Sequence, residues 1–190
     1  MIHLWAAAHV AFPHEEPDYE SEEEELAAFA ESWPTLGTFW PDDDDLIHWY
    51  LRTNANLIDV LTSASPSVEA WTFLRAQSPL EMWARRQAHE NAIHRNDAEE
   101  AAGAVTGFDP GFASDGVDEI LAAFAIRKPS FPVDQPRTML VHASDTGDRW
   151  KVTMSPDGIE TTRDDGPADV TLAGSAADLY VTMCNGWDYT

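Results

Sequence analysis

The first two-thirds of the chain carries apolar residues three and four positions apart, the spacing of amphipathic helices. The predicted helices cover residues 2–12, 46–61, 79–102 and 113–125, and the acidic start of residues 22–33 suits a further short helix. Asp45 and Ser78 stand where N-caps are expected, and Pro79 follows Ser78 in the favoured order of cap and proline. Gly103 is the expected end of the third helix.

The pattern changes to a period of two after residue 137, which is typical of β-strands. The predicted strands are residues 138–143, 150–154, 159–162 and 170–172. Asp145–Asp148 and Asp157–Gly158 have the composition of tight turns between them. Ser175 is placed to cap a last short helix that runs through Leu179 and Met183.

Three prolines between residues 128 and 136 interrupt both periods. We therefore expect a domain boundary there, with a helical domain over residues 1–127 and an α/β domain over residues 128–190. The predicted fold class is α+β: a helical bundle followed by a small antiparallel sheet with a helix.

The charge excludes some classes of function. The chain has 34 acidic against 11 basic residues, a formal net charge of −23, which repels nucleic acid and anionic membranes. The acidic runs at residues 22–25 and 42–45 are more typical of solvated segments than of a DNA mimic. No apolar run reaches the roughly 20 residues of a membrane span, and the single Cys184 permits no intramolecular disulfide, so we expect a cytoplasmic protein.

The segment richest in chemistry is the third helix. Glu90 and His94 are four residues apart, so their side chains lie about 40° apart around the axis and can converge on one divalent ion. His89 and His94 diverge by roughly 140°, which does not fit the two-histidine helix of zinc proteases. One carboxylate and one imidazole form half of a zinc-type site. Arg86 and Asp97 lie near the same face and could orient the two ligands.

A structural reading of these residues stays open. A Glu and a His at this spacing also occur as a weak surface pair, and Arg86 and Arg95 are better suited to ion pairs than to substrate contacts. Among the other candidates, His48, His142 and Cys184 are expected to be structural, and the aromatic residues Trp71, Phe73 and Trp83 are expected in a core.

Residues 83–99, with their Arg-Arg-x-x-His-Glu-x-x-x-His-Arg-x-Asp core, resemble the signature helix of the actinobacterial mycothiol-dependent maleylpyruvate isomerases. Residues 113–121, the run Pro156–Glu160 and residues 168–174 resemble later parts of the same family. The resemblance implies a DinB-like metal-binding bundle followed by a sterol-carrier-like domain. It also implies that Glu90 and His94 bind zinc together with a histidine of an earlier helix.

The sequence differs from the family pattern at the third protein ligand of the metal. The segment Ile2–Ala6 resembles a stretch that follows the family's earlier histidine, so the ligand is expected before Met1, with His3 as a substitute. The chain also stops at Thr190, early for the family. Both ends are therefore expected to be clipped, and the α/β domain to be incomplete.

The resemblance implies a mycothiol-dependent isomerase or thiol transferase. Its substrate is expected to be a small electrophile such as maleylpyruvate, and its partners are that molecule and a low-molecular-weight thiol. The alternatives are a non-catalytic metal- or small-molecule-binding module and an inactive remnant of the family.

Overall fold

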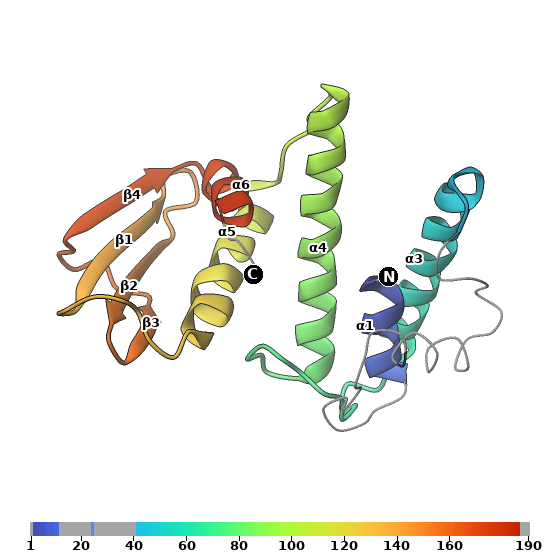
Figure 1. The fold of residues 1–190 in the computed structure, drawn as a ribbon, viewed down its shortest axis with the longest axis horizontal. Coiled ribbons are helices and arrows are strands. Elements are labelled where there is room, and N and C mark those ends of the chain that lie inside the picture. Colours follow the sequence, from blue (N-terminus) through green and yellow to red (C-terminus); the bar gives the residue numbers. More distant parts are fainter. Residues whose placement is uncertain (1, 12–23, 25–40, 187–190) are drawn as a thin grey trace. The chain divides into compact units, whose positions relative to one another are not determined.

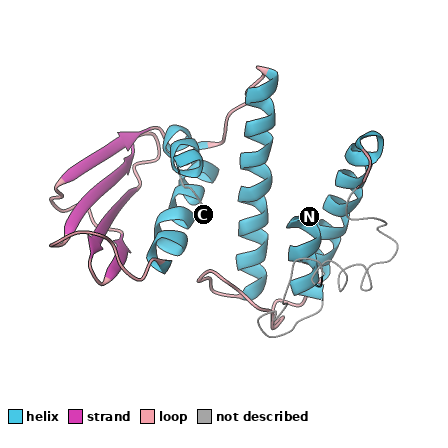
Figure 2. Ribbon diagram, viewed as in Figure 1, coloured by secondary structure: helices cyan, strands magenta, loops and turns pink. Residues whose placement is uncertain are grey.

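The computed structural model describes residues 2–11, 24 and 41–186, and it divides the chain into two compact units (Figure 1). Unit 1 is Met1–Glu90 and unit 2 is Asn91–Thr190, so the division falls inside one long helix. Figure 2 shows that unit 2 holds all the described strands, which confirms the α+β class.

Unit 1 is built from helices α1 (Ile2–Ala11), α3 (Leu46–Ser63) and the first half of α4 (Pro79–Ala102). A 3₁₀ turn, η2 (Asp43–Asp45), leads into α3. Helix α1 packs against α3 and buries Leu4, Ala7 and Val10. The buried residues of α3 are Trp49, Thr53 and Leu57, which repeat every four positions along one face.

An aromatic cluster forms much of the remaining core of unit 1, around His9, whose side chain is fully buried. The imidazole of His9 stacks on Trp83 with ring centroids 5.0 Å apart and an interplanar angle of 15°. Trp5 and Trp71 approach the same imidazole at 4.9 and 5.0 Å, and Phe73 contacts Trp71 at 5.7 Å. The Nε1 group of Trp83 donates to the carbonyl oxygen of Trp71 at 2.9 Å, which fixes the irregular segment before α4 to that helix.

Of the two N-caps expected in unit 1, at Ser78 and Asp45, the one at Ser78 is confirmed. The backbone N–H of Glu81 donates to Ser78 Oγ at 3.1 Å, and the Glu81 carboxylate accepts from Gln77 N at 3.1 Å, so α4 begins with a reciprocal cap. Asp45 stands at the N-cap of α3 but makes no capping hydrogen bond. It is the last residue of η2 and has a helical backbone conformation, and its carboxylate binds Arg52 at 3.0 Å instead.

Unit 2 packs helices on one face of a four-stranded sheet. Besides the second half of α4, its helical part comprises α5 (Pro110–Asp118), the π-helix η3 (Glu119–Phe124), the 3₁₀ turn η4 (Ala125–Arg127) and α6 (Ala176–Gly186). The strands are β1 (Arg137–Ala143), β2 (Arg149–Ser155), β3 (Gly158–Thr162) and β4 (Val170–Gly174), in the order β3-β2-β1-β4.

The sheet is antiparallel in its first three strands, as predicted, with β1 Val141 opposite β2 Trp150. Strand β4 differs, because it pairs parallel to β1 with Leu172 opposite Val141. The 26 residues 144–169 separate β1 from β4. Over that distance no local sequence pattern indicates in which direction β4 runs relative to β1. The core between sheet and helices is mostly aliphatic: Val117, Ile120, Leu121, Val141, Val152, Leu179 and Met183.

Two features join the layers of unit 2. Gly116 of α5 lies so close to the Tyr180 ring of α6 that a Cβ there would sit 2.3 Å from the ring. Asp118 of α5 accepts from Trp150 Nε1 at 2.9 Å and from Arg163 Nη2 at 2.7 Å. A helix is thereby tied to strand β2 and to the segment after β3 by one carboxylate.

The remaining fold predictions divide three ways. Helices at 2–11, 46–63 and 79–102 are confirmed, and the expected helix at 113–125 is present as the succession of α5, η3 and η4. Residue 12 and almost all of the helix expected at 22–33 lie outside the described residues. The domain boundary at residues 127 and 128 stays a prediction. By contact, however, α5 is grouped with the sheet in unit 2.

Candidate metal centre on helix α4

Helix α4 is unusual because polar side chains make up much of its buried surface. Arg86, Gln87, His89 and Asn96 are all buried, whereas residues of these types are mostly at least partly exposed in globular proteins. Asn96 Nδ2 donates to Glu100 Oε1 at 3.0 Å. Buried polar groups occur in functional sites as well as in structural networks, so the surroundings of the two candidate ligands on α4 bear on their role.

Glu90 and His94 lie one turn apart on α4, and each has a charged neighbour on the same helix. Arg86 Nη2 is 3.2 Å from Glu90 Oε1, and the Glu90 side chain is 25% exposed. His94 Nδ1 is 3.3 Å from Asp97 Oδ2, and the His94 side chain is 68% exposed. The two contacts expected from the sequence are therefore present, although the ligand-orienting role of Arg86 and Asp97 stays a prediction.

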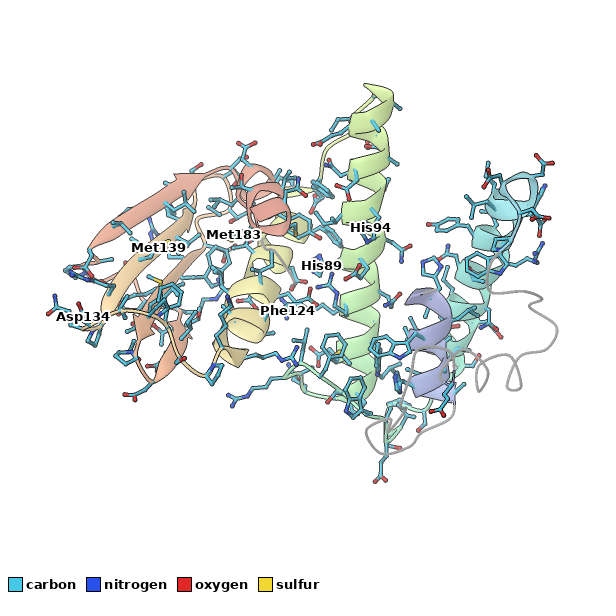
Figure 3. All side chains as sticks on the ribbon, viewed as in Figure 1. His89, His94, Phe124, Asp134, Met139 and Met183 are labelled. Atoms are coloured by element: carbon cyan, nitrogen blue, oxygen red, sulfur yellow. The ribbon has the colours of Figure 1, made fainter. Side chains whose placement is uncertain are left out.

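His89 and His94 lie in different surroundings, as the helical spacing predicts. Figure 3 labels both on α4. His89 is buried, whereas His94 is exposed. The two imidazoles thus lie in different environments, and the expectation that they do not bind one metal ion together stays a prediction.

The donor set fits a divalent cation in kind but supplies only part of a coordination sphere. A carboxylate and an imidazole are ligands that zinc accepts, and a four-coordinate site needs two further donors. Within the described ranges, no three or more His, Cys, Asp or Glu side chains are grouped so that they could hold a metal. His3 is buried on α1, where its Nδ1 lies 3.5 Å from Thr53 Oγ1.

Arg95, the third arginine of the motif, has structural contacts. Its Nη2 donates to the Gly107 carbonyl at 2.8 Å, its Nε lies 3.5 Å from Glu99, and its guanidinium sits 5.3 Å from the Phe108 ring centroid. Hydrogen bonds from the backbone and hydroxyl of Thr106 hold the pKa of Glu99 below its usual value. Together these contacts fix the turn that follows α4, where Gly103 has a φ of +70°.

The other sequence candidates occupy ordinary positions. His48 is exposed, and His142 and Cys184 are half-buried. Trp71, Phe73 and Trp83 belong to the aromatic cluster, as expected. Sequence reasoning missed the place of His9 at its centre, since nothing local links residue 9 to residues 71 and 83. It also missed the Asp118, Trp150 and Arg163 network, whose members are 13 to 45 residues apart.

No helix in the described ranges combines the length and the apolar character that a bilayer crossing needs. Comparison with curated proteins and with solved structures gives no match. A family model does match: the mycothiol maleylpyruvate isomerase N-terminal domain, over residues 1–99, just over half of the chain.

Proposed function

We propose a function from one premise, namely that this chain belongs to the mycothiol maleylpyruvate isomerase family through its N-terminal domain. The proposed activity is a mycothiol-dependent isomerisation or thiol transfer on a small electrophile such as maleylpyruvate. Glu90 and His94 are proposed to contribute two ligands to a divalent metal, most simply zinc. The observation that carries the proposal is the Glu90 and His94 pair, one turn apart within the matched range, with Arg86 and Asp97 beside it.

The neighbours of the two proposed ligands have definable tasks. Arg86 holds Glu90 Oε1, which restricts the rotation of the carboxylate. Asp97 accepts a hydrogen bond from His94 Nδ1 when that nitrogen carries the proton. This tautomer presents Nε2 as the nitrogen with the lone pair, which is the form that binds a metal.

The chemistry proposed for the intact protein is thiolate addition and elimination. Coordination of a thiol to a divalent metal favours the thiolate, which is the nucleophilic form. Addition of the thiolate to the conjugated double bond of maleylpyruvate forms a C–S bond and leaves a C–C single bond that can rotate. Expulsion of the thiolate restores the double bond in the trans isomer. With another electrophile, retention of the C–S bond gives thiol transfer.

Zinc content and zinc affinity of the full chain test the ligand assignment. We expect near-stoichiometric zinc in the wild type and its loss in a Glu90→Ala, His94→Ala double variant. A His48→Ala, Glu69→Ala double variant removes the same two residue types from exposed positions of unit 1 and should keep the metal. Zinc retained by the Glu90 and His94 variant, or absent from the wild type, contradicts the assignment.

A second measurement separates an enzyme from a binding module. The zinc-loaded protein is assayed for conversion of maleylpyruvate with and without mycothiol. Turnover that needs the thiol and falls at least about a hundredfold in the double variant supports catalysis. Full zinc binding without turnover on any thiol and electrophile pair would assign the chain to the non-catalytic alternative.

A further inference from the structure

Helix α3 carries an apolar face that the described part of the molecule leaves in solvent. Ile47, Leu51 and Ile58 are 71%, 55% and 53% exposed. At about 100° per residue they lie within about 40° of one another around the helix axis. The buried face, formed by Trp49, Thr53 and Leu57, points about 140° away from them. The helix therefore has two apolar faces, of which one is used in the fold.

This exposed face differs from a scatter of surface hydrophobics. Single exposed apolar residues are normal, but Ile47, Leu51 and Ile58 share one stripe of α3, with the half-buried Asn54 between Leu51 and Ile58. Exposed apolar groups that lie together in this way are found at interaction sites. A surface helix with one buried face normally places polar residues on the opposite side. Here the polar residues His48, Arg52 and Asp59 occupy a separate stripe, so the exposed side of α3 carries an apolar stripe as well as a polar one.

The charge around the patch indicates the kind of partner. Residues 42–63 contain five aspartates and one arginine, and that arginine already binds Asp45. Four aspartates, Asp42 to Asp45, stand together in the exposed turn that precedes Ile47. One or two acidic groups suffice to complement a helix N-terminus, and four adjacent ones repel each other. A cationic partner would relieve that repulsion.

We propose that the face Ile47, Leu51 and Ile58 docks a basic amphipathic helix of another protein, with the partner's Lys and Arg residues against Asp42–Asp45. A second copy of this chain is a poorer occupant, because it would bring two aspartate runs and two net charges of −23 together. One helix face also offers less than the roughly 800 Å² per partner of a stable interface. The contact is therefore transient and steered by charge.

The test uses the full chain and defined peptides. The probe is a fluorescent Leu and Lys peptide as long as α3, with leucines at helical spacing, and binding is followed by fluorescence anisotropy at low and moderate salt. A peptide of the same composition in scrambled order and a Leu and Glu peptide with the same leucine positions are the ligand controls. We expect micromolar binding of the first peptide only, weakening at least about threefold as salt rises from about 50 to 300 mM.

Variants separate the apolar face from the overall negative charge. Ile47→Gln, Leu51→Gln, Ile58→Gln together should weaken binding by about tenfold or more while leaving net charge unchanged. Val105→Gln with Val170→Gln removes exposed apolar residues of unit 2 and should bind as the wild type does. Asp42→Asn, Asp43→Asn, Asp44→Asn should weaken binding by about three- to tenfold and flatten the salt dependence. Circular dichroism checks that each variant is folded.

Three outcomes overturn the proposal. The first is equal binding of the Leu and Lys peptide to the wild type and to the triple Gln variant, which would show a contact with negative charge alone. The second is equal binding of the Leu and Glu peptide. The third is a dimer of the wild type, seen by sedimentation and abolished in the triple Gln variant, which would assign the face to a second copy.

Discussion

Trp83 and Trp150 allow a direct comparison of the two units, because both are fully buried and each donates a hydrogen bond from Nε1 to an oxygen 2.9 Å away. Trp83 of unit 1 donates to a backbone carbonyl and stacks on His9 within the aromatic cluster. Trp150 of unit 2 donates to the Asp118 carboxylate and lies under the Arg163 guanidinium, 4.5 Å from its ring centroid. The partners of Trp83 are thus a backbone carbonyl and other rings, whereas those of Trp150 include two charged side chains.

The two units also differ in the side chains that fill their buried positions. In unit 2 most buried positions are apolar, and the carboxylates of Asp118 and Asp148 accept hydrogen bonds from serine, tryptophan and arginine side chains. In unit 1, the buried surface of α4 includes Arg86, Gln87 and His89. Buried polar groups of this kind occur at functional sites and in structural networks, so they make α4 a candidate for function without deciding between the two.

Replacing each tryptophan by phenylalanine gives the largest difference between the units. Trp150→Phe should lower the free energy of unfolding by about 2–4 kcal/mol, because it removes a hydrogen bond to a carboxylate as well as ring contacts. Trp83→Phe should cost about 1–2 kcal/mol, because a phenyl ring still stacks on His9 and a neutral hydrogen bond is lost. Urea unfolding followed by circular dichroism measures both. Equal costs, or the reverse order, would contradict the contrast between the units.

Gly116→Ala tests the tight packing of helices in unit 2. The added Cβ would meet the Tyr180 ring at 2.3 Å, so α5 and α6 have to separate or the ring has to turn. Overpacking of this kind should cost about 1–3 kcal/mol in the free energy of unfolding, despite the better helix propensity of alanine. Gly111→Ala on the same helix is the control, since its Cβ would meet only the Asp109 side chain at 3.2 Å. A loss for Gly111→Ala as large as that for Gly116→Ala would point to backbone effects instead.

Helix caps should contribute equally to the free energy of unfolding in the two units. They therefore test whether the difference between the units is confined to their cores. Ser78→Ala in unit 1 and Ser175→Ala in unit 2 each remove an Oγ acceptor 3.1 Å from a backbone N–H. Each should cost about 1 kcal/mol. Asp45→Ala should cost less than about 0.5 kcal/mol, because Asp45 makes no capping bond and its pair with Arg52 is exposed. Thermal unfolding of the three variants at neutral pH measures these values, and an Asp45→Ala loss matching the serine variants would show a hidden cap.

Local signals predicted much of both units from sequence. Caps such as Ser78 and Ser175, the turn at Gly158 and the strand alternation around Val141 depend on neighbouring residues, so they could be read directly. The failure at Asp45 is also local: a 3₁₀ turn places its backbone in helical conformation, and no pattern in the aspartate run announces that turn.

Contacts between distant residues set the limit of prediction. The parallel pairing of β4 with β1, the stacking of His9 on Trp83 and the Asp118 network each join segments that are tens of residues apart. The metal centre shows the same limit. Glu90 and His94 could be chosen because a helix brings them together, whereas a further ligand has to come from another element.

The smallest expected effect is a pH dependence that belongs to unit 2. Hydrogen bonds from Ser114 and Thr146 and the Arg163 guanidinium hold the pKa of Asp148 below its ordinary value. A carboxyl with a depressed pKa in the folded state contributes stability above its unfolded pKa of about 4 and loses it as pH falls through the folded pKa. Asp148→Asn should therefore remove part of the acid sensitivity of unfolding below about pH 4, by a modest amount because the side chain is 40% exposed to solvent.

Asp59→Asn on α3 is the matched control, since it removes one negative charge without touching this cluster. Ser114→Ala removes the largest cause of the shift, so the Asp148 carboxyl should titrate closer to its ordinary pKa in NMR spectra of that variant. Parallel acid unfolding curves for the wild type and Asp148→Asn would mean that solvent screens the cluster fully. In that case the ion pairs and hydrogen bonds of unit 2 stabilise the fold by fixing α5 to β2 through Asp118, and the ionisation of Asp148 adds nothing measurable.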